Sequence, residues 1–284
     1  MKITFNNLLT LKVETFHELF LLENYQEILL LDMTDFNLNY IPNEIEYLVN
    51  LKILIANNIN LTQLPENLIK LKKLEVLILN FNKFELSPSH IYYLENLKVL
   101  SLIKNEIKII PKEISQIFNL KKLLISFNKI SQISKEIGEL NLEQLDMKNN
   151  FILTLPNSIT KLITLKSLDL CDNYIKIIPK NIWLLENLEE LFMNNNKINI
   201  LPKEIYKLRK LKRLSFSNNN IKIIPTSFNK LENIDFIALI NNKIENIKEI
   251  TIIDKLVLDN NDILRIANNY ELVKILKKYK IETL

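Results

Sequence analysis

The sequence predicts an α/β solenoid of about eleven repeats, with a curved parallel β-sheet on its concave face and short helical or 3₁₀ segments on its convex face. Prolines recur every 23 residues (65 minus 42, for example), apart from one interval of 45 (156 minus 111). Six further columns of apolar or asparagine residues recur in step with them. A fixed period of about 20 to 50 residues is typical of stacked repeats. The prolines are Pro42, Pro65, Pro88, Pro111, Pro156, Pro179, Pro202 and Pro225.

Each repeat begins with a segment that alternates apolar and other residues, which predicts a short strand with one buried face. Leucine or isoleucine opens the repeat, and apolar residues follow three and five positions later. Because no repeat can bury its apolar face alone, we expect strands of successive repeats to stack in parallel. The opening column contains Ile28, Leu51, Leu74, Leu97, Leu120, Leu142, Leu165, Leu188, Leu211, Ile234 and Ile253.

Asparagine dominates the position eight residues after the opening residue, where the chain must turn. Its side chain can bond to neighbouring backbone groups, so stacked copies are expected to form an internal hydrogen-bond ladder. Phe36 and Ile59 hold this position in the first two repeats, where the ladder should be absent. The asparagines are Asn82, Asn105, Asn128, Asn150, Asn173, Asn196, Asn219, Asn242 and Asn261.

The proline begins the second half of each repeat. The residue before a proline favours extended geometry, and proline itself is suited to the first turn of a helix. The apolar spacing that follows, as in Ile114 and Ile117 after Pro111, predicts a short helical or 3₁₀ segment with one apolar side. Ser134 replaces the proline in one repeat. The final spacing is 19 residues (253 minus 234), so the solenoid should tighten there.

The ends of a solenoid need caps that shield its core. We therefore predict an N-terminal helical cap over residues 1–27, the solenoid over 28–267 and a C-terminal helical cap over 268–284. Residues 14–22 and 270–279 each have the pattern of a helix with one apolar side.

The repeated pattern L-x-x-L-x-L-x-x-N-x-I-x-x-I-P resembles the leucine-rich-repeat family over residues 28–267. In detail it is similar to the proline-containing 23-residue class of intracellular Ras-group proteins and of several bacterial repeat proteins. This resemblance implies a protein partner, such as a small GTPase, a phosphatase, a kinase or, in a pathogen, a host protein. The sequence selects none of these.

Composition excludes several other classes of function. Gly138 is the single glycine, so a glycine-rich phosphate-binding loop cannot form, and we expect no cofactor. Cys171 is the single cysteine, which favours a reducing compartment, and the N-terminal residues do not resemble a secretory leader, so we expect a cytoplasmic protein. A net charge of +4 is too small to indicate nucleic acid or a membrane surface as partner.

No arrangement of reactive residues predicts catalysis. His17, His90 and Cys171 lack the spacing of a zinc site. Asp146, Asp169 and Asp172 fall on neighbouring strands, but Lys148 lies among them, so we interpret them as a solvated acidic patch with no metal. Because the repeats and caps occupy the whole chain, we predict that the protein is not an enzyme.

The concave face carries the functional information, because residues that point outward from the strands are not needed for the core. Large apolar residues are concentrated in repeats two to five, and exposed patches of this kind usually contact a partner. The predicted partner-binding residues are Ile53, Ile55, Val76, Ile78, Phe81, Val99, Ile103, Leu124 and Phe127.

The middle repeats are polar at the same positions, with Gln144, Asp146, Ser167 and Asp169. An apolar area with a polar continuation suits a protein or peptide partner. We therefore predict a protein–protein interaction scaffold. A recognition or sensor module for a ligand, and a homodimer formed through the concave face, remain alternatives.

Overall fold

The computed structural model describes residues 1–5, 10–12, 14–36, 38–245, 247, 249–252 and 255–258. The predicted C-terminal cap and two column residues, Ile253 and Asn261, lie outside the described residues. The chain divides into two compact units, Met1–Leu142 and Glu143–Leu284. We call them the N-terminal and C-terminal units.

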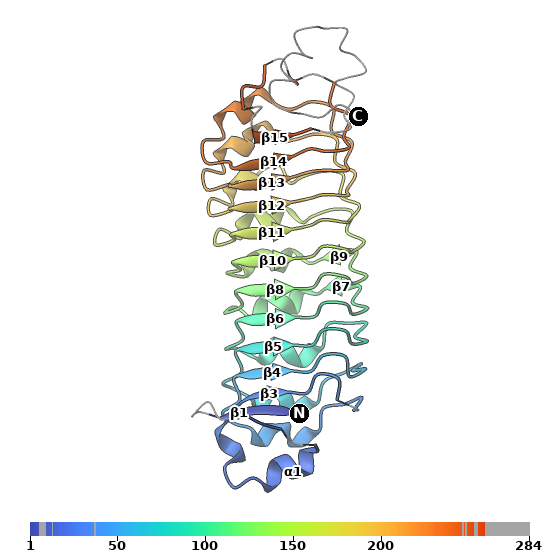
Figure 1. The fold of residues 1–284 in the computed structure, drawn as a ribbon, viewed down its shortest axis with the longest axis vertical. Helices are drawn as coiled ribbons and strands as arrows, with labels where there is room; N and C mark the ends of the chain where they lie inside the picture. Colours follow the sequence, from blue (N-terminus) through green and yellow to red (C-terminus); the bar gives the residue numbers. More distant parts are fainter. Residues whose placement is uncertain are drawn as a thin grey trace. The chain divides into compact units, whose positions relative to one another are not determined.

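The N-terminal unit contains a sheet in which the repeat strands pair in parallel, like the rungs of a ladder (Figure 1). The middle residue of each three-residue strand points inward, so Leu54, Leu77 and Leu100 align in register and are fully buried. The strands of the unit are β1 Lys2–Phe5, β2 Thr10–Lys12, β3 Ile28–Asp32, β4 Ile53–Ile55, β5 Val76–Ile78, β6 Val99–Ser101 and β8 Lys122–Leu124, with a separate pair formed by β7 Ile109–Ile110 and β9 Gln132–Ile133.

The N-terminal residues add to this sheet in a way that the sequence analysis did not predict. Helix α1, Phe16–Leu21, lies within the predicted helical segment, and the Thr15 hydroxyl accepts the Glu18 N–H at its N-terminus. However, β1 pairs antiparallel with both β3 and β2. The segment 1–27 is therefore not purely helical, because β1 covers the edge of the first repeat strand, which would otherwise expose unpaired backbone groups.

The C-terminal unit repeats the same arrangement. Its strands also pair in parallel with matching registers, and Leu168, Leu191 and Leu214 form its fully buried central row. The strands are β10 Gln144–Asp146, β11 Ser167–Asp169, β12 Glu190–Phe192, β13 Arg213–Ser215, β14 Phe236–Ala238 and β15 Leu256–Val257.

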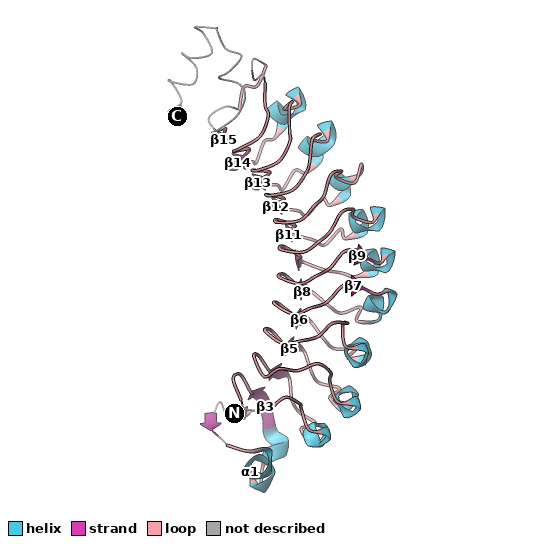
Figure 2. Ribbon diagram, turned by 90° about the vertical axis from the view of Figure 1, so that its right-hand side faces the viewer, coloured by secondary structure: helices cyan, strands magenta, loops and turns pink. Residues whose placement is uncertain are grey.

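Short 3₁₀ helices lie opposite the strands in both units (Figure 2). Proline is the N-cap residue of most of them, as predicted, and Ser134 takes this place in η6. Most of them are five residues long, and the residue that follows, such as Leu71 after η3, is buried again. They are η1 Tyr25–Glu27, η2 Asn43–Tyr47, η3 Glu66–Lys70, η4 Ser89–Tyr93, η5 Lys112–Gln116 and η6 Lys135–Glu139, followed by η7 Asn157–Lys161, η8 Ile182–Leu184, η9 Lys203–Lys207 and η10 Thr226–Lys230.

The predicted asparagine ladder is confirmed. Asn82 Nδ2 donates to the carbonyl oxygens of Ala56 in the preceding repeat and Leu79 in its own, at 2.8 and 3.0 Å. Its Oδ1 accepts the Leu61 N–H at 3.0 Å. These bonds satisfy backbone groups that the turn would otherwise leave buried and unpaired. Asn82 therefore joins two successive repeats, and Asn105 and Asn128 do the same.

Candidate partner-binding surface

All nine predicted partner-binding residues lie in the N-terminal unit, on β4, β5, β6 and β8 or in the turns that follow them. We call these nine residues the apolar patch. Its strand residues are half-buried because the alternating pattern turns the leucines between them into the core. The patch is thus a surface of the concave, strand-bearing side of this unit.

The strand register brings much of the patch together. Val76 lies opposite Ile53 on one side and Val99 on the other. Ile55 lies opposite Ile78 in the next row. The second row is then interrupted, because buried Ser101 separates Ile78 from Leu124. The patch is continuous over β4 and β5 and thinner towards β8.

Phe81 and Phe127 are the most exposed members of the apolar patch, at 50% and 40%. Both have a left-handed backbone, with φ of 58° and 56°. A bulky side chain disfavours this conformation, which costs on the order of 1 kcal/mol per residue. Neither ring recovers that cost by full burial, so packing alone does not explain their presence.

Lys104 lies between these two phenylalanines and was missed by the sequence analysis. It also has a left-handed φ, of 53°. Its Nζ lies 4.8 Å from the ring centroid of Phe81 and 5.5 Å from that of Phe127, which is within cation–π range. The repeat spacing could have located Lys104, because residues 81, 104 and 127 are each 23 apart.

A second set of asparagine bonds fixes the turns that carry these side chains. Asn80 Oδ1 accepts the Ile103 N–H at 2.8 Å and the Ser101 hydroxyl at 2.7 Å. Asn57 Oδ1 accepts the Asn80 N–H at 2.8 Å. The left-handed residues therefore project from turns that are bonded from repeat to repeat.

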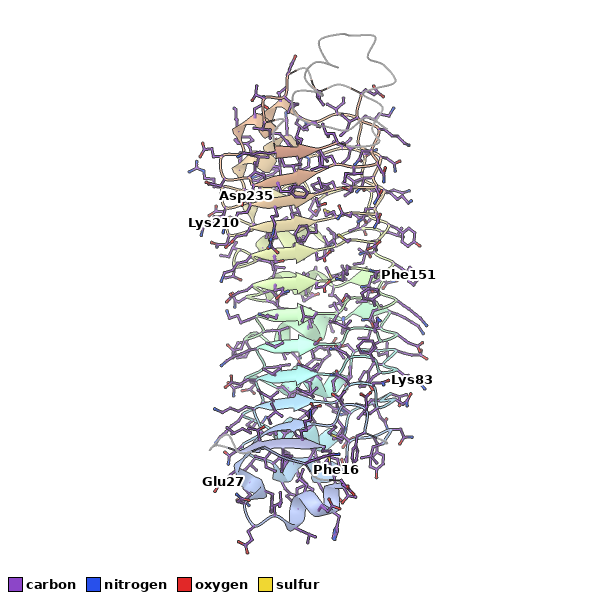
Figure 3. All side chains as sticks on the ribbon, in the orientation of Figure 1. Phe16, Glu27, Lys83, Phe151, Lys210 and Asp235 are labelled. Atoms are coloured by element: carbon purple, nitrogen blue, oxygen red, sulfur yellow. The ribbon has the colours of Figure 1, made fainter. Side chains whose placement is uncertain are left out.

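Ion pairs in the N-terminal unit join exposed residues of successive repeats. Figure 3 shows Glu27, which precedes β3, and Lys83, which follows β5, at opposite edges of this unit. Lys98 pairs with Glu75 at 2.7 Å and Lys129 with Glu106 at 2.8 Å. All of these groups are solvent-exposed to a large degree, so each pair contributes little to stability.

The strand face of the C-terminal unit is polar on β10 and β11, whereas Phe192 and Phe236 lie on the outward side of β12 and β14. Asp146 and Asp169 are register neighbours, and each accepts the N–H two residues onward, from Lys148 at 3.1 Å and Cys171 at 3.0 Å. Asp172 accepts from Asn195 Nδ2 at 2.7 Å. Within the described ranges, no group of three or more His, Cys, Asp or Glu side chains is placed to hold a metal ion.

The remaining reactive side chains are dispersed. Cys171 is a free, half-buried thiol, and burial, followed by the nearby Asp169 carboxylate, raises its pKa well above the usual value. A raised pKa keeps the thiol protonated and poorly nucleophilic. In the N-terminal unit, His17 lies on α1 and His90 on the convex helix η4.

An exposed isoleucine row in the C-terminal unit was also missed. Ile177, Ile200 and Ile223 are 75%, 73% and 71% exposed. Each lies two residues before one of the repeat prolines, on the chain between a strand and the next convex 3₁₀ helix. The sequence gives little indication that these isoleucines are exposed, because each lies within a short apolar run whose other members are buried.

A cavity in the N-terminal unit lies away from the apolar patch. It has a volume of about 660 Å³ and lies between α1 and the convex loops, lined by Phe16, His17, Tyr40 and Glu44 among others. None of the helices in the described part of the chain has the length and apolar character needed to cross a membrane.

Comparison with known proteins identifies the repeats. A family model described as a leucine-rich repeat region matches residues 157–282, and the Leucine Rich Repeat model matches residues 141–162. A search of curated protein sequences finds no match.

Solved structures show the same fold. A leucine-rich-repeat protein of Leptospira interrogans is 29% identical, with a TM-score of 0.62, over 87% of this chain and 75% of its own. An internalin of Listeria monocytogenes is 20% identical, with a TM-score of 0.62, over 84% and 83%. The plant peptide hormone receptor RGFR1 in complex with RGF2 is 24% identical, with a TM-score of 0.60, over 78% of this chain and 41% of the receptor. This chain thus spans less than half of that receptor.

The narrower 23-residue class stays a prediction from the proline spacing. The broader assignment rests on the matching repeat models, the parallel strand ladder and the similar structures. The chain contains leucine-rich repeats and has the fold of the leucine-rich-repeat proteins.

Proposed function

We propose that this protein is a protein–protein interaction scaffold that binds a partner through the apolar patch, with no catalysis of its own. The observation that carries the proposal is the pair of half-exposed rings, Phe81 and Phe127, held beside an aligned apolar strand surface. Exposed aromatic side chains of this kind serve as anchors in protein interfaces.

The repeats support a binding role, because leucine-rich repeats generally mediate protein–protein interaction. One similar structure is a receptor in complex with RGF2. The single cysteine favours a cytoplasmic location, which is part of the proposal. A homodimer through the same patch would use the same residues.

The experiment is an affinity capture that compares the wild type with a Phe81→Asn/Phe127→Asn double variant. Other repeats have asparagine at this position, as at Asn149 and Asn195, with the same left-handed backbone. The double variant should therefore keep the fold. The matched control is Phe118→Asn, because Phe118 is equally exposed (52%) but follows the convex helix η5.

The proposal expects a partner that is held by the wild type and by the control and lost by the double variant. A partner that the double variant retains would place binding elsewhere and contradict the proposal. Light scattering on the same three proteins tests the homodimer, which requires that the double variant alone becomes monomeric.

A further inference from the structure

Phe81, Lys104 and Phe127 form one cluster in the turn column of the N-terminal unit. We call it the Phe–Lys–Phe cluster. All three side chains are exposed, and the Lys104 ammonium lies over both rings. The cluster is a single positive charge framed by two aromatic faces.

The residue types at this left-handed position set the cluster apart. The other repeats fill this left-handed position with side chains that tolerate positive φ: Asp35, Asn58, Asn149, Asp172, Asn195, Asn218 and Asn241. These residues also bond along the column, as Asn58 Nδ2 does to Asp35 Oδ1 at 2.6 Å. In three successive repeats, the bulky residues Phe81, Lys104 and Phe127 occupy this position in place of asparagine or aspartate. Strain that packing does not explain is typical of functional sites.

The positive charge of Lys104 is available to a ligand. Among the residues that the structure describes, Lys104 forms no ion pair, whereas nearby carboxylates of this unit are paired with other lysines: Glu75 with Lys98, Glu85 with Lys108 and Glu106 with Lys129. The Phe81 and Phe127 rings flank the ammonium, and a cation beside apolar surface attracts an anion more strongly than one in bulk water.

We propose that the Phe–Lys–Phe cluster binds a carboxylate of an extended peptide segment whose neighbouring apolar side chains rest on the apolar patch. This proposal rests on the proposed function and names the chemistry of the partner. A lone ammonium suits a singly charged carboxylate, whereas phosphate recognition favours several donors and the forked guanidinium of arginine.

The surrounding geometry sets the spacing of the expected sequence motif. Ile55 and Ile78 lie opposite each other on the neighbouring strands β4 and β5, and adjacent strands are about 4.8 Å apart. An extended peptide advances about 3.3 Å per residue. An acidic residue over Lys104 would thus place an apolar residue two or three positions away over this part of the patch.

The test selects binders to the full chain from a display library of random twelve-residue peptides. Affinities of the selected peptides are then measured by fluorescence anisotropy for the wild type, Lys104→Met, Lys104→Arg and Lys83→Met. Lys83 is an exposed lysine of the same unit outside the apolar patch and is the matched control. Each peptide is also made with its acidic residue changed to the amide.

We expect selected peptides that pair an acidic residue with apolar residues two or three positions away. Lys104→Met should weaken binding at least about fivefold, while Lys104→Arg and Lys83→Met stay within about twofold. On the wild type, changing the acidic residue of the peptide to its amide should weaken binding by the same factor as Lys104→Met does. On Lys104→Met, the amide should weaken binding no further, because in a double-mutant cycle both changes remove the same interaction.

Failure of this inference differs from failure of the proposed function. Peptides that are lost with Phe81→Asn/Phe127→Asn but bind Lys104→Met as tightly as the wild type would overturn the carboxylate proposal alone. If no selected peptide is lost with the double variant, the apolar patch is not the binding surface and both proposals are wrong.

Discussion

Asn173 holds the preceding repeat of the C-terminal unit through Ile152, whose backbone N–H donates to Asn173 Oδ1 at 3.0 Å. The same side chain donates through Nδ2 to the carbonyl oxygen of Met147 at 3.0 Å. Both contacts are buried, so the backbone groups that they satisfy have no access to water. The ladder is therefore a structural requirement of the fold and does not depend on a ligand.

Replacing Asn173 with alanine should destabilise the protein by about 2–3 kcal/mol, because buried N–H and C=O groups lose their partners. Urea unfolding followed by circular dichroism measures the change. Asn199→Ala is the control, since Asn199 is exposed and its substitution should cost no more than about 0.5 kcal/mol. Equal midpoints for the two variants would contradict the structural role of the ladder.

The repeat columns predicted the fold because each column has one physical role. The asparagine and proline positions could be located from spacing alone, and Asn82 and Pro65 lie where that spacing requires. The antiparallel strand β1 could not be predicted in this way, because Lys2–Phe5 is short and belongs to no repeat.

The candidate surface was predictable only in part. Strand alternation identified Ile53 and Val76, since a strand has two faces. Lys104 was overlooked because a search for apolar residues passes over a lysine, although it shares the column of Phe81. Ile177 was overlooked because periodicity cannot decide which member of an apolar run faces solvent.

Because the backbone of Lys104 is left-handed, glycine should be more favourable than alanine at this position, the reverse of the usual order. Lys104→Gly should be more stable than Lys104→Ala by about 1 kcal/mol, because glycine adopts positive φ without a steric cost. Thermal unfolding of the two variants gives the difference.

Lys122 provides the matched control, because it is an exposed lysine on strand β8 of the same unit. There the order should reverse, with the glycine variant less stable than the alanine variant by about 0.5–1 kcal/mol. If Lys104→Ala is as stable as Lys104→Gly or more stable, the backbone of the Phe–Lys–Phe cluster is not strained at position 104.

Stability should fall at high pH through Tyr92, whose burial raises the pKa of its phenol to about 12. The folded protein keeps this proton while the unfolded chain releases it near pH 10, so the contribution is complete below pH 10 and declines as the pH approaches 12. The loss due to Tyr92 should reach about 1 kcal/mol at pH 11. Urea unfolding at pH 8 and pH 11 measures it.

Tyr92→Phe should remove this part of the pH dependence, since phenylalanine has no proton to release. Tyr93→Phe is the control, because Tyr93 is adjacent in sequence but 56% exposed. The prediction is wrong if the two variants lose equal stability between pH 8 and pH 11.

The exposed isoleucine row should be dispensable for folding. Another repeat has threonine at the equivalent position, Thr154. The free energy of unfolding of an Ile177→Thr/Ile200→Thr/Ile223→Thr variant should therefore lie within about 0.5 kcal/mol of the wild-type value. Ile175→Thr makes the matched comparison, because Ile175 is fully buried two residues before Ile177. That single change should cost about 2 kcal/mol or more, since it removes packed methylene groups and buries a hydroxyl. Urea unfolding separates the two outcomes, and a triple variant as unstable as Ile175→Thr would mean that the row is packed against other parts of the protein.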